Sequence, residues 1–89
     1  MRDTEKLYES LKYKSPFRGY SISAYREDYT YKVYSYNTLI FSYDLLHKEI
    51  IKFNSEKYSR TTSKYQNIIK DFIENHGLKY QEDNQGESN

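Results

Sequence analysis

The sequence predicts a small α+β domain: an antiparallel sheet of three to four strands packed against a C-terminal helix, with a short N-terminal helix. Three observations favour this class. Apolar residues recur at helical spacing near both ends of the chain, β-forming residues alternate between them, and turn-forming residues interrupt the alternation. Helices segregated from the strands are typical of α+β folds. The 89 residues suffice for one domain. We expect this domain over residues 1–80 and a disordered acidic tail over residues 81–89.

The N-terminal helix is predicted over residues 3–14, which read DTEKLYESLKYK. Leu7, Tyr8 and Leu11 share one face at helical spacing, so this face can dock on a sheet. A residue that precedes a proline avoids helical geometry, and Pro16 therefore ends the helix.

A connector with a turn at Gly19 leads into the predicted strands. Alternating β-forming residues predict strands over four stretches: residues 20–25, 29–36, 38–43 and 50–54. The first stretch is the optional fourth strand of the sheet. On the second stretch, every second residue is expected to face the core, namely Tyr29, Tyr31 and Val33. The opposite face then carries Lys32, Tyr34 and Tyr36, and both of these tyrosines are expected to be partly exposed.

The C-terminal helix is the most clearly marked element of the chain. An apolar stripe at helical spacing consists of Tyr65, Ile68, Ile69, Phe72 and Ile73. Gly77 stands where a left-handed residue commonly ends a helix, and Leu78 can make the apolar contact that accompanies such an end. We therefore expect a core-facing helix that ends at Gly77.

The segment that enters this helix, which we call the helix entrance, is rich in hydroxyls and bases: Ser59, Arg60, Thr61, Thr62, Ser63 and Lys64. One hydroxyl side chain can cap the helix while the others bond to local backbone groups. The free backbone N–H groups of a helix start can also bind an anion. We expect a structural cap, in which Thr61 and Thr62 fix how the helix meets the sheet. The alternative anion-binding or nucleic-acid-binding set comprises Arg60, Thr61, Thr62, Ser63 and Lys64.

No set of residues is typical of a catalytic or metal site. The chain has no cysteine, which excludes disulfides, Cys-based zinc sites and a thiol nucleophile. His47 and His76 have no second ligand at metal-site spacing, and no phosphate-binding glycine motif is present. We therefore expect a protein that is not an enzyme and needs no cofactor or metal. No apolar run reaches the ~20 residues of a membrane helix, and the charged N-terminus lacks the apolar region of a signal peptide. We expect no membrane partner and a cytoplasmic protein.

Bases and tyrosines supply the candidate binding surface. The net charge is +1, and residues 10–26 contain four bases and no acid. Such a cluster is either a solvated face or a surface that meets phosphate or an acidic protein. The 12 tyrosines are assigned first to the core, second to a protein interface and third to nucleic-acid stacking. The candidates for partner binding are Tyr20, Tyr25, Tyr34 and Tyr36, with Arg18 and Lys32 at the rim.

Two stretches, SYNTLIFSYD and YSRTTSKYQNII, resemble a small domain of short proteins from phages and plasmids of low-GC Gram-positive bacteria. That domain is similar to a pattern of Ser-Tyr-x-Thr, two strands, and Tyr-Ser-x-Thr-Thr-Ser-Lys-His before a helix. The resemblance covers roughly residues 33–73, and the matching residues are Ser35, Tyr36, Thr38, Tyr58, Ser59, Thr61, Thr62, Ser63 and Lys64. Tyr65 stands where the domain usually has histidine, so no role of that histidine is carried over. Some relatives of the domain resemble anti-CRISPR proteins, which are phage-encoded inhibitors of bacterial defence nucleases.

The resemblance implies a phage or mobile-element protein that binds a host defence nuclease, above all one of the Cas9 type, or its complex with guide RNA. Inhibition would follow from steric occlusion by the tyrosine-rich surface. An alternative from a different class is a small nucleic-acid-binding protein, in which the helix entrance binds phosphate and the sheet tyrosines stack bases. The sequence also leaves open a homodimer formed through an edge strand or through residues 20–25.

Overall fold

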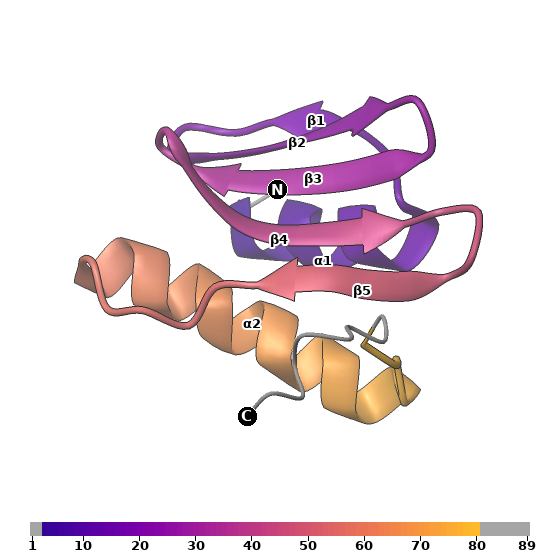
Figure 1. The fold of residues 1–89 in the computed structure, drawn as a ribbon. Coiled ribbons are helices and arrows are strands. Elements are labelled where there is room, and N and C mark those ends of the chain that lie inside the picture. Colours follow the sequence, from indigo (N-terminus) through magenta and orange to yellow (C-terminus); the bar gives the residue numbers. More distant parts are fainter. Residues whose placement is uncertain (1–2, 81–89) are drawn as a thin grey trace.

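The structure is a computed structural model that describes residues 3–80, and it has the α+β class that the sequence predicts (Figure 1). Its elements in chain order are α1 (Asp3–Tyr13), β1 (Phe17–Arg18), β2 (Ile22–Glu27), β3 (Thr30–Ser35), β4 (Thr38–Asp44), β5 (Glu49–Phe53) and α2 (Arg60–His76). The five strands form one antiparallel sheet in the order β1-β2-β3-β4-β5. The tail predicted over residues 81–89 lies outside the described residues.

The sheet has one strand more than the three to four predicted, because part of the expected connector forms β1. Phe17 pairs with Ala24, and Arg18 pairs with Ser23. Two residues are too few to produce an alternating pattern, so the sequence alone does not reveal this strand.

The turn expected at Gly19 lies against the start of α1. The backbone N–H of Tyr20 donates to Oδ2 of Asp3 at 2.8 Å. A Cβ atom added at Gly19 would lie 2.8 Å from the same carboxylate, so a larger residue here would displace the Asp3 side chain. On the inner side of α1, Leu7 and Leu11 are completely buried, as their spacing predicts.

A two-residue turn of Asp28 and Tyr29 joins β2 to β3. Asp28 adopts φ +56°, a left-handed conformation that aspartate tolerates better than most residues. Tyr29 is 66% exposed, so the prediction that it faces the core is wrong. The turn occupies the position at which the alternating sequence pattern would begin the strand. The next two residues of the predicted core face, Tyr31 and Val33, are completely buried as predicted.

The core lies between the two helices and one face of the sheet. Ser10 of α1 hydrogen-bonds with Tyr31 on β3, and Thr62 of α2 hydrogen-bonds with Ser35 on the same strand at 2.8 Å. Both helices therefore lie on the face of the sheet that carries Tyr31 and Ser35, which we call the covered face; the other is the open face. The core cluster comprises Leu7, Leu11, Ile22, Ala24, Tyr31, Val33, Ile40, Phe41, Tyr43, Ile50, Tyr65, Ile69, Phe72 and Ile73.

The helix α2 ends as predicted, and its start at Arg60 selects Ser59 among the possible caps of the helix entrance. Its N-cap is Ser59, whose side chain accepts a hydrogen bond from the backbone N–H of Thr62 at 3.2 Å. Gly77 ends the helix at φ +60°, and its N–H donates to the carbonyl of Ile73. None of the helices within residues 3–80 combines the length and the apolar character that crossing a membrane requires.

Candidate functional site

The open face of the sheet is the side that carries neither helix (Figure 1). The strand register places its side chains in rows that run across the strands. One row holds Tyr25, Lys32, Ser42 and Lys52, and a neighbouring row holds Arg18, Ser23, Tyr34 and Leu39. Tyrosines and bases from four strands therefore meet on one surface.

A hollow on the open face is lined by Ser23, Tyr25, Arg26, Glu27, Lys32, Tyr34, Tyr36 and Asn37. The rings of Tyr25 and Tyr34 meet edge to face, with their centroids 6.0 Å apart. Such a pair favours one relative arrangement of the two rings. Tyr36 occupies the turn after β3 at φ +57° and is 57% exposed. The hollow thus offers two paired rings and one projecting ring.

Polar contacts position the charged side chains around this hollow. The Nζ atom of Lys32 donates to Oε1 of Glu27 at 2.9 Å. This hydrogen bond and then the charge of Glu27 raise the pKa of Lys32. A hydrogen bond with Ser23, followed by one with Arg18, lowers the pKa of the Tyr25 hydroxyl. The pairing of β1 with β2 brings Arg18 to this place.

Most of the predicted partner-binding residues gather here: Tyr25, Lys32, Tyr34 and Tyr36 line the hollow. Arg18 lies at its edge, because it pairs with Ser23, which lines the hollow. Tyr20 is not among the lining residues; it lies in the loop between β1 and β2 and is 96% exposed. That these residues bind a partner stays a prediction.

Sequence reasoning missed Glu27, the acid beside Lys32. In the hairpin of β2 and β3, Tyr25 pairs with Lys32 and Glu27 pairs with Thr30. Glu27 and Lys32 are therefore diagonal neighbours on the same face. The turn at Asp28 was the available signal, because a two-residue turn fixes the register of a hairpin. The other lining residues that were missed are Ser23, Arg26 and Asn37.

On its inner side, the helix entrance is part of the architecture. Thr62 is 2% exposed, and its hydroxyl lies 2.8 Å from that of Ser35, which is completely buried. The hydroxyl of Ser59 lies 3.3 Å from that of Thr62 and also caps the helix. Thr61 is half-buried. Thr62 thus joins α2 to β3 and turns its hydroxyl away from any ligand in solvent.

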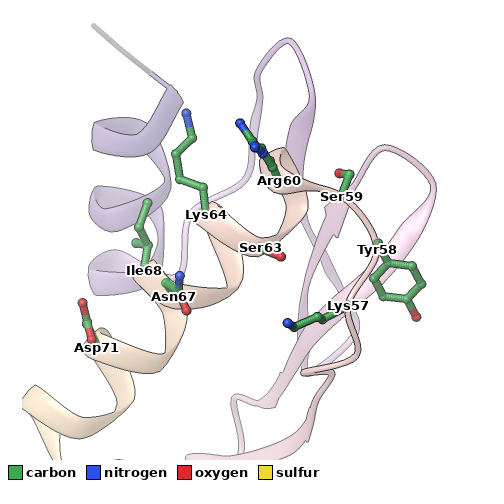
Figure 2. A pocket seen from close by; sticks show the side chains of 9 residues that line it. All are labelled: Lys57, Tyr58, Ser59, Arg60, Ser63, Lys64, Asn67, Ile68 and Asp71. Carbon is green, nitrogen blue, oxygen red and sulfur yellow. The ribbon is translucent and has the colours of Figure 1, made fainter.

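On its outer side, the helix entrance borders a second hollow (Figure 2). Its lining residues are Lys57, Tyr58, Ser59, Arg60, Ser63, Lys64, Asn67, Ile68 and Asp71. Arg60 and Lys64 extend to the same side of the helix. Ser63 also lines this hollow, whereas Thr61 and Thr62 do not. Of the predicted anion-binding set, Arg60, Ser63 and Lys64 therefore border the hollow, and Thr61 and Thr62 do not.

The two hollows lie on different sides of the sheet. Lys32 and Tyr34 belong to the open face, whereas α2 packs on the covered face through the contact of Thr62 with Ser35. A nucleic-acid strand that stacked on the sheet tyrosines and also bound the helix entrance would have to pass around the sheet. The geometry does not bring together the two parts of the nucleic-acid hypothesis.

Two further titratable groups lie in structural contacts. The Nζ atom of Lys14 lies 4.6 Å from the ring centre of Tyr43 and 5.4 Å from that of Phe72. Burial there lowers the pKa of Lys14. The Nδ1–H group of His47 donates a 2.8 Å hydrogen bond to Oδ2 of Asp44 in the turn before β5, and this bond raises the pKa of His47. Among residues 3–80, no cluster of three or more histidines and carboxylates is arranged to hold a metal ion.

Comparison with known proteins identifies no relative of this chain. No protein-family model matches the sequence, and no curated protein or solved structure matches it either.

Proposed function

We propose that this chain is a phage or mobile-element protein that inhibits a bacterial defence nuclease of the Cas9 type. Its open face docks on the nuclease, or on the complex with guide RNA, and blocks nucleic-acid entry or a conformational step by steric occlusion. The observation that carries the proposal is the hollow in which Tyr25, Tyr34 and Tyr36 surround Lys32. The resemblance of residues 33–73 supplies the class of partner. The site of action is then the cytoplasm of the bacterial host.

Tyrosines suit a docking surface because they offer large contact area with few rotatable bonds. The ring of Tyr25 packs edge to face against the ring of Tyr34. It therefore loses little freedom when a partner binds. The projecting Tyr36 is the candidate anchor, since a few tyrosines often supply most of the affinity of an interface. Docking of this kind needs no catalytic group, and the proposed inhibitor acts by binding alone.

A pull-down with a panel of bacterial defence nucleases, each with and without guide RNA, tests the proposal. We expect a Cas9-type nuclease to be retained, and we expect Tyr36→Ala to weaken its binding about tenfold or more. The matched variant Tyr13→Ala removes a ring that is 64% exposed on α1, and it should change binding by less than about twofold. If no nuclease in the panel retains the wild-type protein, the proposal is wrong.

The alternative is a small nucleic-acid-binding protein. The observation that favours it is the second hollow, where Lys57, Arg60 and Lys64 line the same surface (Figure 2). Phosphates would bind these bases, so the affinity would fall steeply with salt concentration. In an electrophoretic shift assay at low salt, the combined change Arg60→Ala and Lys64→Ala should abolish the complex. Absence of any complex of the wild-type protein with single- or double-stranded DNA or RNA removes this alternative.

A further inference from the structure

The charge on the open face changes sign along the strands. The middle row holds Tyr25, Lys32, Ser42 and Lys52, and the next row toward the turn between β2 and β3 holds Glu27, Thr30, Asp44 and Glu49. Arg18 belongs to the row on the other side of the middle one. The bases therefore occupy two adjoining rows, and a row with three carboxylates bounds them on one side.

We infer that the open face binds an acidic polypeptide segment of its partner. This inference rests on the proposed function, because it names the chemistry of the surface on which the inhibitor docks. Arg18, Lys32 and Lys52 distribute positive charge over β1, β3 and β5. Among the residues that line the hollow, Glu27 is the one acid. Carboxylates of the partner meet these bases, while the neighbouring tyrosine rings cover its apolar groups.

The size of the basic zone favours a short acidic segment over a nucleic-acid strand. Adjacent rows on one face are about 6.6 Å apart, and the four strand spacings from β1 to β5 cover about 19 Å. A polyanion that continued along the strands would bring its phosphates beside Glu27 and Glu49, well within the ~10 Å range of charge interactions. The rings of Tyr25 and Tyr34 also meet edge to face, which does not provide parallel platforms for successive bases.

Glu27 is an internal competitor for the partner. Its carboxylate lies 2.9 Å from the ammonium group of Lys32, while its own side chain is 69% exposed. Exposed ion pairs contribute little free energy in water, so a carboxylate of the partner can take the place of Glu27 at Lys32. Removing the charge of Glu27 should therefore strengthen the binding of an acidic partner and weaken that of a basic one.

Fluorescence anisotropy at low salt, with two labelled probes of similar charge, tests this inference. One probe is a peptide of about eight glutamates, and the other is an oligothymidylate of about eight nucleotides. We expect the wild-type protein to bind the glutamate peptide more tightly than the oligothymidylate. Glu27→Gln should tighten the peptide complex about threefold, and Lys32→Ala should weaken it about threefold. The controls Glu74→Gln and Lys70→Ala change the same charges at exposed positions of α2 and should alter the affinity by less than about 1.5-fold.

The inference is overturned if the glutamate peptide does not bind or binds less tightly than the oligothymidylate. It is also overturned if the α2 controls change the peptide affinity as much as the changes at Glu27 and Lys32, because net charge alone would then explain the binding. The nuclease pull-down separates this inference from the proposed function. A nuclease that binds the wild type but binds Glu27→Gln no more tightly contradicts an acidic contact and leaves the docking proposal standing. Binding of the peptide without retention of any nuclease contradicts the nuclease proposal and supports the acidic chemistry.

Discussion

Thr62→Val probes how α2 is attached to the sheet. Thr62 is 2% exposed, and its hydroxyl lies 2.8 Å from that of the completely buried Ser35. Valine keeps the branched shape of threonine but carries a methyl group in place of the hydroxyl, so Ser35 loses this buried partner. Such a loss costs about 1–3 kcal/mol. Because the same hydroxyl is also within 3.3 Å of Ser59, we expect the free energy of unfolding to fall by about 2 kcal/mol.

Urea denaturation measures this change as a lower midpoint with an unchanged slope. A loss of about 2 kcal/mol is a large part of the stability of a domain of this size, which is on the order of 5–10 kcal/mol. The control Thr61→Val alters a half-buried neighbour and should cost less than about 0.5 kcal/mol. Combining Thr62→Val with Ser35→Ala should reveal a coupling of about 1 kcal/mol. If the two changes simply add within about 0.3 kcal/mol, the hydrogen bond does not hold α2 to β3 and the reasoning is refuted.

Three further predictions concern a buried phenol, a turn and a helix end. Burial raises the pKa of Tyr31 from 10.0 to about 12. The unfolded chain therefore releases this proton at lower pH than the folded chain, and the free energy of unfolding falls by about 2–3 kcal/mol between pH 10 and pH 12. In urea denaturation over this pH range, Tyr31→Phe should reduce this loss of stability. The same loss in the variant would disprove the assignment to Tyr31. Asp44→Asn should lower the pKa of His47 toward 6.5 in an NMR titration, since the Asp44 hydrogen bond raises it; no movement would contradict the pairing. Gly77→Ala should cost about 1 kcal/mol in thermal unfolding, because alanine is strained at the φ of +60° even though no atom lies within 4 Å of an added Cβ. A neutral effect would contradict the left-handed conformation at the end of α2.

Local patterns were sufficient for elements whose side chains repeat over several turns. The apolar stripe from Tyr65 to Ile73 and the glycine at position 77 mark α2, because neighbours in the sequence set both the spacing and the end of a helix. The strand β1 could not be predicted, since its two residues form a strand only by pairing with β2. The alternating pattern places Tyr29 in the core, but Tyr29 is exposed in a turn. This turn is hard to recognise in the sequence because its left-handed residue is Asp28 and not a glycine.

For the candidate site, the sequence could predict only that residues of the same strand share a face. Lys32 and Tyr34 were expected on one outer face, because side chains alternate along a strand. Their meeting with Tyr25 and Glu27 depends on the hairpin register, and the approach of Arg18 depends on the pairing of β1. The role of each hydroxyl at the helix entrance likewise required contacts between residues distant in the sequence, which no local pattern contains.

The central claim is that the open face is the docking surface, and hydroxyl-radical footprinting of the tyrosines tests it most directly. Tyr25 and Tyr36 report on the open face, Tyr58 reports on the helix entrance and Tyr13 reports on α1; all are between 43% and 64% exposed in the free protein. In the complex with a Cas9-type nuclease, we expect the oxidation of Tyr25 and Tyr36 to fall several-fold, while Tyr13 and Tyr58 react as before. Protection of Tyr58 or Tyr13 without protection of Tyr25 and Tyr36 would contradict the central claim.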